Sequence, residues 1–349
     1  MQLVINTFGT SIHRKGELFQ FKIGDKKVEL AARKIQSILI TTGVHFSSDS
    51  ILLATEHNID IVLLDKYGKP FGRFWNGKMG STAAIRRAQL EYSESDNGLL
   101  VVKNWTITKL KNQEIFLREL LRRRPGQELL FDPAINRLKE NQKKIEAIQG
   151  NISKLRGSIM GYEGSAAAAY WKILGKLPPE QFQFKNRTQH PALDPVNAMI
   201  NYSYGVLYSK VERACIIAGL DPYIGFFHTD NYNKKSLVFD MIEVFRIHAD
   251  KVVMKLFTGR QCRNDMFRKE SSGSIILEKQ AKELLLTKFN EYMAEKVRYN
   301  VKNSKTGKTR QIKRIDTIQA EAHTLANSMI NKETKDIPAI TEIEDIVHG

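Results

Sequence analysis

The stretch GFFHTDNYNKKSLVFDMIEVFRIHADK (residues 225–251) carries one histidine in a polar segment and then two acids in an apolar one. The spacing of its apolar residues predicts a helix. Asp240 and Glu243 share one face of that helix with Ser236 and Ile247, since the steps between them are four, three and four residues. The rest of the helix is apolar, so we expect it to be buried. Carboxylates in such a place are costly unless they are paired, hydrogen-bonded or bound to a metal.

Two interpretations of these acids stay open from the residues alone. For an arbitrary helix the simpler one is an ion pair of Asp240 or Glu243 with Arg246, and a lone His228 is more often an ordinary loop or core histidine. Together, however, His228 and the two acids form a donor set that Mg²⁺ or Mn²⁺ accepts. The segment GYEGSAAAAYW (161–171) offers a further carboxylate, Glu163, which by itself indicates only a favourable charge near a helix N-terminus.

The composition suggests a globular protein with a polyanionic partner. The chain has 349 residues, of which 42% are hydrophobic, and this is enough for two domains with real cores. Its formal charge is +16 and its pI is about 9.6, which favours nucleic acid or an anionic membrane surface as partner. The start of the chain lacks a signal-peptide pattern and no apolar run reaches membrane-spanning length. We therefore expect a soluble, cytoplasmic protein, with Cys215 and Cys262 as reduced thiols.

The patterning predicts an α+β protein, with a small N-terminal β-strand domain followed by a larger all-α domain. Short alternating runs broken by turns fill residues 1–85, with one small helix that begins after Ser47 or Ser48. Helical spacing dominates afterwards, and caps around Asp132 and Pro133 separate two of the helices. We expect a β domain at 1–85, a linker at 86–100, a helical domain at 101–330 and a flexible tail at 331–349.

Several motifs resemble those of a known family. LDPYIGFFH (220–228) followed by SLVFDMIEVFR (236–246) is similar to the core signature of the CRISPR-associated spacer-acquisition integrases, the DNA-cutting and DNA-joining member of the two universal adaptation proteins. GYEGSAAAAYW resembles the glutamate motif of that family, and HPALDPVNAMI (190–200) its connecting segment. KLKNQEIFL (109–117) is similar to its first helical region. The likeness runs in order from the first strands to about residue 330, although the arginine often found before the glutamate motif is missing.

The resemblance implies a reaction and a site. Glu163, His228 and Glu243 would be the metal ligands for Mg²⁺ or Mn²⁺, and Asp240 matches an additional acidic position of the catalytic set. The reaction would join the 3′-hydroxyl ends of short DNA fragments into a CRISPR array by phosphodiester transesterification. The helical domain would be catalytic, and the β domain would form a homodimer. The expected partners are double-stranded DNA and the second, small adaptation protein.

Basic residues suggest where DNA would be held. Arg246 and Lys251 follow the acids closely, and Arg86 and Arg87 form a pair after the β region. Residues 301–314 are rich in Lys and Arg and contain no acid. The nucleic-acid-binding residues that we expect are Arg246, Lys251, Arg86, Arg87, Lys302, Lys305, Lys308 and Arg310. Runs of this kind position DNA through its phosphates without reading the base sequence.

Two other functions remain open from the sequence. One is a stand-alone metal-dependent nuclease that acts on branched DNA in repair, which would cut without joining and need no partner protein. The other is a non-catalytic architectural DNA binder, whose binding would survive loss of the acids. An architectural binder does not account for the carboxylates and the histidine that match the family motifs.

Overall fold

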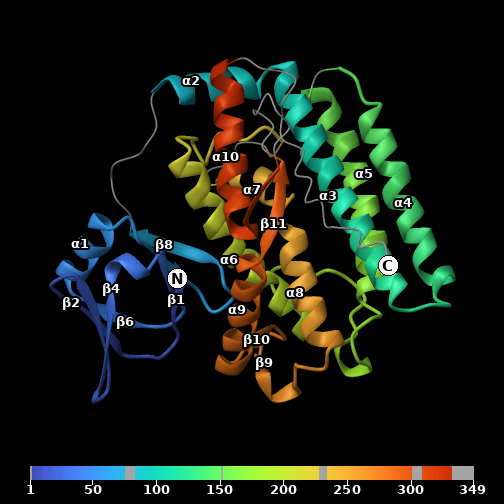
Figure 1. The fold of residues 1–349 in the computed structure, drawn as a ribbon. Coiled ribbons are helices and arrows are strands. Elements are labelled where there is room, and N and C mark those ends of the chain that lie inside the picture. The colour runs from blue at the N-terminus through green and yellow to red at the C-terminus, as the bar shows by residue number, and fades with distance from the viewer. Residues whose placement is uncertain (1, 75–82, 151, 228–233, 301–308, 332–349) are drawn as a thin grey trace.

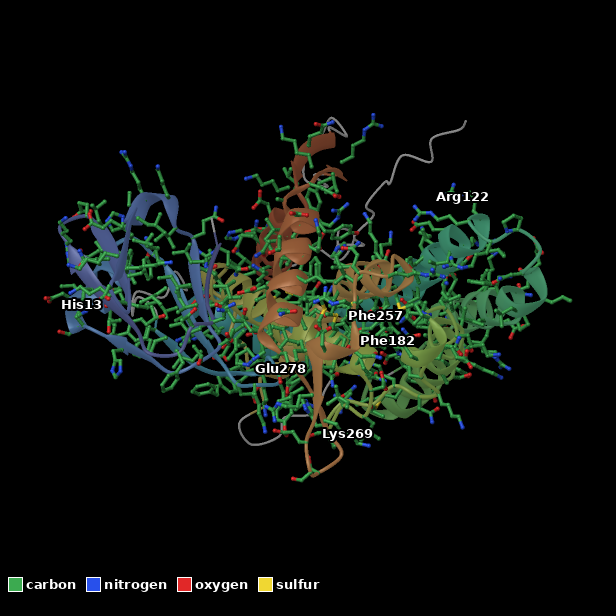
Figure 2. All side chains as sticks on the ribbon, turned by 90° about the horizontal axis from the view of Figure 1, so that it is seen from below. His13, Arg122, Phe182, Phe257, Lys269 and Glu278 are labelled. Atoms are coloured by element: carbon green, nitrogen blue, oxygen red, sulfur yellow. The ribbon has the colours of Figure 1, made fainter. Side chains whose placement is uncertain are left out.

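The computed structural model describes residues 2–74, 83–150, 152–227, 234–300 and 309–331. The β region lies at one end of the molecule and the helices fill the rest (Figure 1). Figure 2 shows the same separation, with His13 in the β region at one end and Arg122 at the other. The α+β class expected from the sequence is confirmed.

The β region consists of two four-stranded sheets. The first has the order β1-β5-β7-β8, with parallel pairing except at β8. Its strands are β1 (Gln2–Ile5), β5 (Ser37–Ile40), β7 (Asp60–Leu64) and β8 (Pro70–Phe74). The second has the order β4-β3-β2-β6 and contains β2 (Thr10–Lys15), β3 (Leu18–Ile23), β4 (Lys26–Ala31) and β6 (Val44–Phe46).

Local sequence signals account for the connections in this region. Gly24 begins the two-residue turn between β3 and β4 with a φ of 57°, a conformation that glycine adopts without strain. Helix α1 (Ser48–Glu56) is capped by Ser47, whose hydroxyl accepts the backbone N–H of Ser50 at 3.2 Å. The helix start predicted after Ser47 or Ser48 is thus confirmed, with Ser47 as the cap.

The first sheet is shared between two hydrophobic cores. Ile38 and Ile61 belong to the core of the β region, where they join residues such as Phe19. Their neighbours Leu39 and Val62 point to the opposite face and belong to the large core of the helical region. The strands β5 and β7 are therefore covered on both sides.

The helical region packs around α6, with α3, α4 and α5 side by side on the flank away from the sheets (Figure 1). Its helices are α2 (Ala83–Ser93), α3 (Asp96–Arg122), α4 (Glu128–Glu146), α5 (Ile152–Leu174), α6 (Pro195–Ile217), α7 (Ser236–Ile242), α8 (Arg246–Thr258), α9 (Lys279–Ala294) and α10 (Arg314–Asn331). Two small hairpins interrupt it, which the sequence did not predict: β9 (Phe267–Lys269) with β10 (Ile275–Leu277), and β11 (Lys296–Asn300) with β12 (Thr309–Lys313). None of the described helices is long and apolar enough to cross a membrane.

Three boundaries differ from the expectation. Residues 86–100, expected as a linker, lie in α2 and the start of α3, because buried side chains such as Tyr92 and Leu99 pack them into the core. Helix α4 begins at Glu128, so Asp132 and Pro133 lie inside it rather than at its cap. The tail was expected at 331–349. Asn331 is instead the last residue of α10, and residues 332–349 lie outside the described residues.

The β region docks on the helices through a close backbone contact. Gly68, in the turn between β7 and β8, lies against α6, and a Cβ atom on Gly205 would come within 1.8 Å of the Gly68 carbonyl oxygen. Arg73 of β8 adds a buried polar contact, since it donates to the carbonyl of Ser209 at 2.8 Å and lies 3.4 Å from Glu212. The absence of a side chain at both glycines is what allows this approach.

Candidate metal and nucleic-acid site

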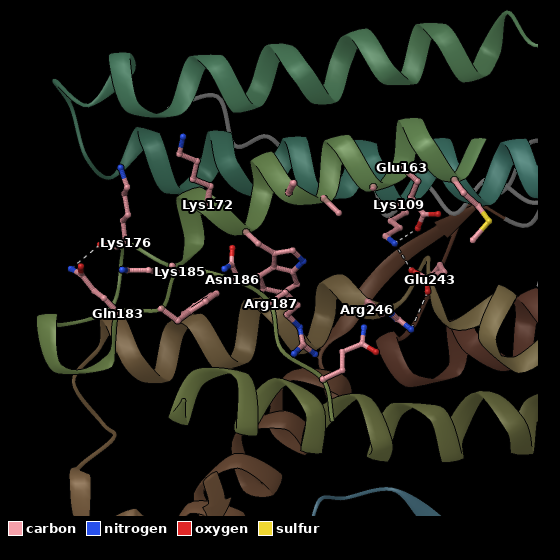
Figure 3. Close-up of a pocket in the computed structure, with 18 residues that line it drawn as sticks. Lys109, Glu163, Lys172, Lys176, Gln183, Lys185, Asn186, Arg187, Glu243 and Arg246 are labelled. Carbon is pink, nitrogen blue, oxygen red and sulfur yellow. Dashed lines mark hydrogen bonds and ion pairs between the residues drawn. The ribbon is translucent and has the colours of Figure 1, made fainter. Parts of the chain in front are cut away.

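Three elements bring one lysine between two carboxylates. Glu163 lies in the middle of α5, Glu243 directly after α7, and Lys109 on α3 (Figure 3). The Lys109 ammonium donates to Glu163 Oε1 and lies 2.5 Å from Glu243 Oε2. The side chains are largely buried, with exposures of 11% for Lys109, 19% for Glu163 and 13% for Glu243. Burial alone would lower the pKa of Lys109, but the charges of Glu243 and Glu163 outweigh it and the pKa is raised, so this group stays cationic.

The single helix expected over the two acids is wrong, because the chain breaks it at Glu243. Helix α7 ends at Ile242 and α8 begins at Arg246, with a turn between them. The side chain of Asn112 on α3 donates to the carbonyl of Val244 at 3.2 Å, which satisfies a backbone group within this turn. Glu243 thus stands at a junction of elements, where its carboxylate reaches the lysine of α3.

Asp240 has a different environment from Glu243. It is 2% exposed, and its Oδ2 accepts the backbone N–H of Phe226 at 2.6 Å and that of Phe227 at 2.9 Å. Gly225 makes this approach possible, since a Cβ atom there would lie 2.9 Å from the same oxygen. Asp240 therefore anchors the backbone that leads directly to His228. His228 itself lies outside the described residues.

Arg246 connects the carboxylates to a buried polar network. Its guanidinium lies 3.0 Å from Glu243 Oε1, so the ion pair considered from the sequence is present. The same group stacks 4.8 Å from the ring of Tyr204, whose hydroxyl donates to Asp250 at 2.7 Å. Tyr170 donates to the other oxygen of Asp250 at 2.9 Å. Burial raises the pKa of Asp250 to about 6, although both tyrosine hydrogen bonds act in the opposite direction.

A basic groove of about 1100 Å³ opens beside the acid pair. Figure 3 shows Glu163, Glu243 and Lys109 at one end and three lysines at the other, with Arg187 between them. The guanidinium of Arg187 lies over the rings of Trp171 and Tyr204 at 5.5 and 5.4 Å. The groove lysines are Lys172, Lys176 and Lys185. A groove of this charge suits a phosphodiester backbone.

A second, much smaller cavity of about 10 Å³ shares Lys109, Glu163 and Glu243 with the groove. The three acids of the site line it, together with Phe227, the last described residue before His228. Its size corresponds roughly to one water molecule or ion. Within the described ranges no three carboxylate, imidazole or thiol groups form a complete ligand cluster. The carboxylates and the cavity nevertheless fit a hard divalent cation. His228, the third ligand expected from the sequence, lies outside the described residues.

The expected DNA contacts are distributed over several places. Arg246 lies at the site, whereas Lys251 lies 3.1 Å from Glu119 and is 14% exposed. Arg86 lies 4.0 Å from Asp221. Arg87 is exposed on α2, and Arg310 lies in β12, where only its backbone is described. The remaining three, Lys302, Lys305 and Lys308, lie outside the described residues.

Sequence reasoning missed Lys109, Arg187 and the groove lysines. Lys109 opens the segment KLKNQEIFL, which was singled out only for its likeness to a helical region. Helix α3 carries other charged residues, such as Lys103 and Lys111, so no local signal distinguished Lys109. Arg187 and the lysines lie in or beside an irregular segment between α5 and α6, where no periodicity points to a site.

Comparisons with known proteins identify relatives of this chain. The family model described as CRISPR associated protein Cas1 matches residues 3–291. The CRISPR-associated endonuclease Cas1 2 of Rhodospirillum rubrum is 30% identical over 305 residues, which is 84% of this chain and 87% of that protein. Among solved structures, a casposase bound to integration product has a TM-score of 0.84 at 22% identity and covers 98% of this chain and 94% of its own. A Cas6-RT-Cas1–Cas2 complex has a TM-score of 0.79 at 20% identity, and the match covers 99% of this chain and 36% of the chain in that complex.

Proposed function

The chain belongs to the CRISPR-associated protein Cas1 family, and on this premise we propose that it is a metal-dependent DNA integrase and endonuclease of CRISPR adaptation. The observation that carries the proposal is the juxtaposition of Glu163 and Glu243 at the end of a basic groove. Its relatives include an endonuclease and, by fold, an enzyme bound to an integration product. The site would act in the cytoplasm, where the DNA lies.

The proposed reaction exchanges one phosphodiester bond for another. The 3′-hydroxyl oxygen of a short DNA fragment attacks a phosphorus atom of the CRISPR repeat and forms a new P–O bond. The attacking hydroxyl releases its proton, the P–O bond to the 3′-oxygen of the adjoining nucleotide breaks, and that oxygen takes up a proton and leaves as a hydroxyl. When water replaces the hydroxyl, the same exchange is hydrolysis. No external energy source is needed, because the number of phosphodiester bonds is conserved in joining.

The protein's own residues would position the reacting strand. Arg246 lies 3.0 Å from Glu243, so a phosphate held by this guanidinium would stand next to the carboxylates. Arg187 lines the groove and stacks on aromatic rings, which keeps its planar donors oriented. Glu163, His228 and Glu243 would hold Mg²⁺ or Mn²⁺. The ion would act as a Lewis acid toward the scissile phosphate.

Assembly is a further part of the proposal. We propose a homodimer through the β regions, where Phe8 and Phe71 are 83% and 70% exposed. The small second adaptation protein would bridge such dimers, as the structural likeness to a Cas6-RT-Cas1–Cas2 complex suggests. Light scattering of the chain with Phe71→Glu tests the homodimer, which should dissociate in this variant.

The test of function is strand transfer of a labelled duplex with free 3′-hydroxyls into a repeat-containing plasmid. It is run with Mn²⁺ or Mg²⁺, with and without the small partner protein. Glu243→Gln and His228→Ala should lose joining by at least about 100-fold, while duplex binding stays. Glu114→Gln is the matched control, since Glu114 is a similarly buried carboxylate that pairs with Arg118 at 2.9 Å.

Other outcomes separate the competing functions. Cutting without joining, unaffected by the partner, would favour the stand-alone repair nuclease. DNA binding without chemistry under every metal condition would favour the architectural binder and contradict the proposal.

A further inference from the structure

We propose that Lys109 is the resident cation of the carboxylate pair and that a divalent metal enters the site by displacing its ammonium. This inference rests on the metal site proposed above. It concerns a residue that the sequence motifs did not single out.

The position of the ammonium is the first argument. One nitrogen atom contacts carboxylate oxygens of both Glu163 and Glu243. Hard divalent cations are likewise held between carboxylate oxygens. The ammonium therefore occupies the place between the two carboxylates that a metal ion would take, and both cannot be there together.

The charge of the site is the second argument. The two carboxylates carry two negative charges, and Lys109 and Arg246 supply two positive ones at 2.5 and 3.0 Å. The charges of these four groups thus cancel one another, while Asp240, the third acid of the site, accepts the backbone N–H groups of Phe226 and Phe227. A dication added to a neutral, largely buried cluster gains little attraction, whereas departure of the lysine restores a net negative charge. Displacement is therefore the route by which the site acquires affinity for a metal.

The surroundings give the displaced side chain somewhere to go. Lys109 lines both the basic groove and the small acid-lined cavity, so its ammonium stands at the boundary between the two. A lysine side chain is long and flexible, and it can turn into the groove while α3 stays in place. A phosphate in the groove would be its alternative anion. Metal entry and strand binding would then favour one another. The metal releases the lysine for a phosphate, and a phosphate in the groove gives the displaced lysine a new partner.

The same contact stabilises the metal-free protein. Without Lys109, the two largely buried carboxylates would repel each other. Arg246 would remain as the cation that the structure shows beside Glu243. Replacing the lysine should therefore weaken the metal-free fold and strengthen metal binding. A purely structural ion pair predicts the first effect without the second.

The first experiment measures Mn²⁺ binding by calorimetry to the full chain, without DNA, for the wild type, Lys109→Met and Lys251→Met. Lys251 is the matched control, since its side chain is 14% exposed, close to the exposure of Lys109, and it pairs with Glu119 at 3.1 Å. We expect Lys109→Met to bind Mn²⁺ at least about 10-fold more tightly than the wild type, and Lys251→Met to bind like the wild type. Saturating Mn²⁺ should also raise the unfolding temperature of Lys109→Met more than that of the wild type.

The second experiment needs no variant and covers a failure of Lys109→Met to fold. The wild type is treated with an amine-acylating reagent, and modification of each lysine is followed by mass spectrometry with and without Mn²⁺. Metal should increase the acylation rate of Lys109 several-fold and leave Lys251 unchanged.

The outcomes distinguish this inference from the proposed function. If the wild type binds Mn²⁺ but Lys109→Met binds no more tightly, or metal leaves the acylation of Lys109 unchanged, the displacement is refuted and the metal site stands. If no form of the protein binds Mn²⁺, the inference and the proposed metal site fall together.

Discussion

The carboxylate of Asp240 accepts the backbone N–H of Phe227 at 2.9 Å, one residue before His228. An acid that the sequence predicted on one helical face with Glu243 thus holds the backbone that leads to residue 228. Since the same oxygen accepts the N–H of Phe226, the approach of this segment to the site is fixed by two bonds to one buried atom. Two hydrogen bonds to the backbone of Phe226 and Phe227 are therefore a sufficient reason for a buried acid at this position.

Asp240→Ala should destabilise the protein by roughly 2–4 kcal/mol, because two buried N–H groups lose their acceptor. Asp240→Asn keeps an acceptor oxygen and should lose less than half of that. Urea unfolding of the two variants measures the difference. Equal stability of Asp240→Ala and the wild type would refute the anchoring role.

Gly205→Ala should weaken the protein although the position is helical. Alanine usually stabilises a helix by up to about 1 kcal/mol relative to glycine, but here its Cβ would meet the Gly68 oxygen at 1.8 Å. We expect a loss of about 1–3 kcal/mol, as for an overpacked core. Gly157→Ala in α5 is the control, since nothing lies within 4 Å of its Cβ, and it should stabilise. Thermal unfolding compares them, and a stabilising Gly205→Ala would mean that the turn between β7 and β8 does not sit on α6.

Asp250→Asn should flatten the pH dependence of stability in the acidic range. The pKa of Asp250 is about 6 in the folded protein, above the usual value near ~3.9, so the folded state holds this proton more tightly. The contribution of Asp250 to folding is then most favourable below pH ~4 and declines as the pH rises to about 6, by up to roughly 3 kcal/mol. Urea unfolding at several pH values across this range tests it. A wild type and a variant with parallel profiles would contradict the assignment.

Lys172→Ala combined with Lys176→Ala should weaken duplex binding and lower its salt dependence. Both lysines are exposed and line the groove beside the acid pair. Each lost phosphate contact should reduce the slope of log affinity against log salt by about 0.9. The pair Lys26→Ala and Lys27→Ala, exposed on β4 away from the groove, serves as control. If both double variants behave alike, only the overall charge of the protein matters.

Local signals in the sequence were sufficient for much of the fold. Ser47 caps α1 through its own hydroxyl, and Gly24 forms the hairpin turn after β3, so both elements are readable from a few neighbouring residues. The break between α7 and α8 was not readable, because no glycine or proline stands at 243–245. It is stabilised from outside by Asn112, a residue 132 positions away from Val244.

The site was predictable only in part for the same reason. Glu163 and Glu243 stood out through the motifs that surround them, and the structure brings them to one lysine. Lys109 lies 54 residues from Glu163, and the sequence around Lys109 does not indicate a pairing with two acids. Such a contact depends on how α3, α5 and the α7–α8 junction pack, which is decided by the core as a whole.

The sheet with two covered faces has a consequence for how the chain melts. Leu39 and Val62 are buried by the helices while Ile38 and Ile61 are buried by the second sheet, so neither region can come apart without exposing apolar strand surface of the other. The two regions should therefore unfold together, in one calorimetric transition. A fragment cut after residue 74 would carry an uncovered hydrophobic face and should aggregate rather than behave as an autonomous module.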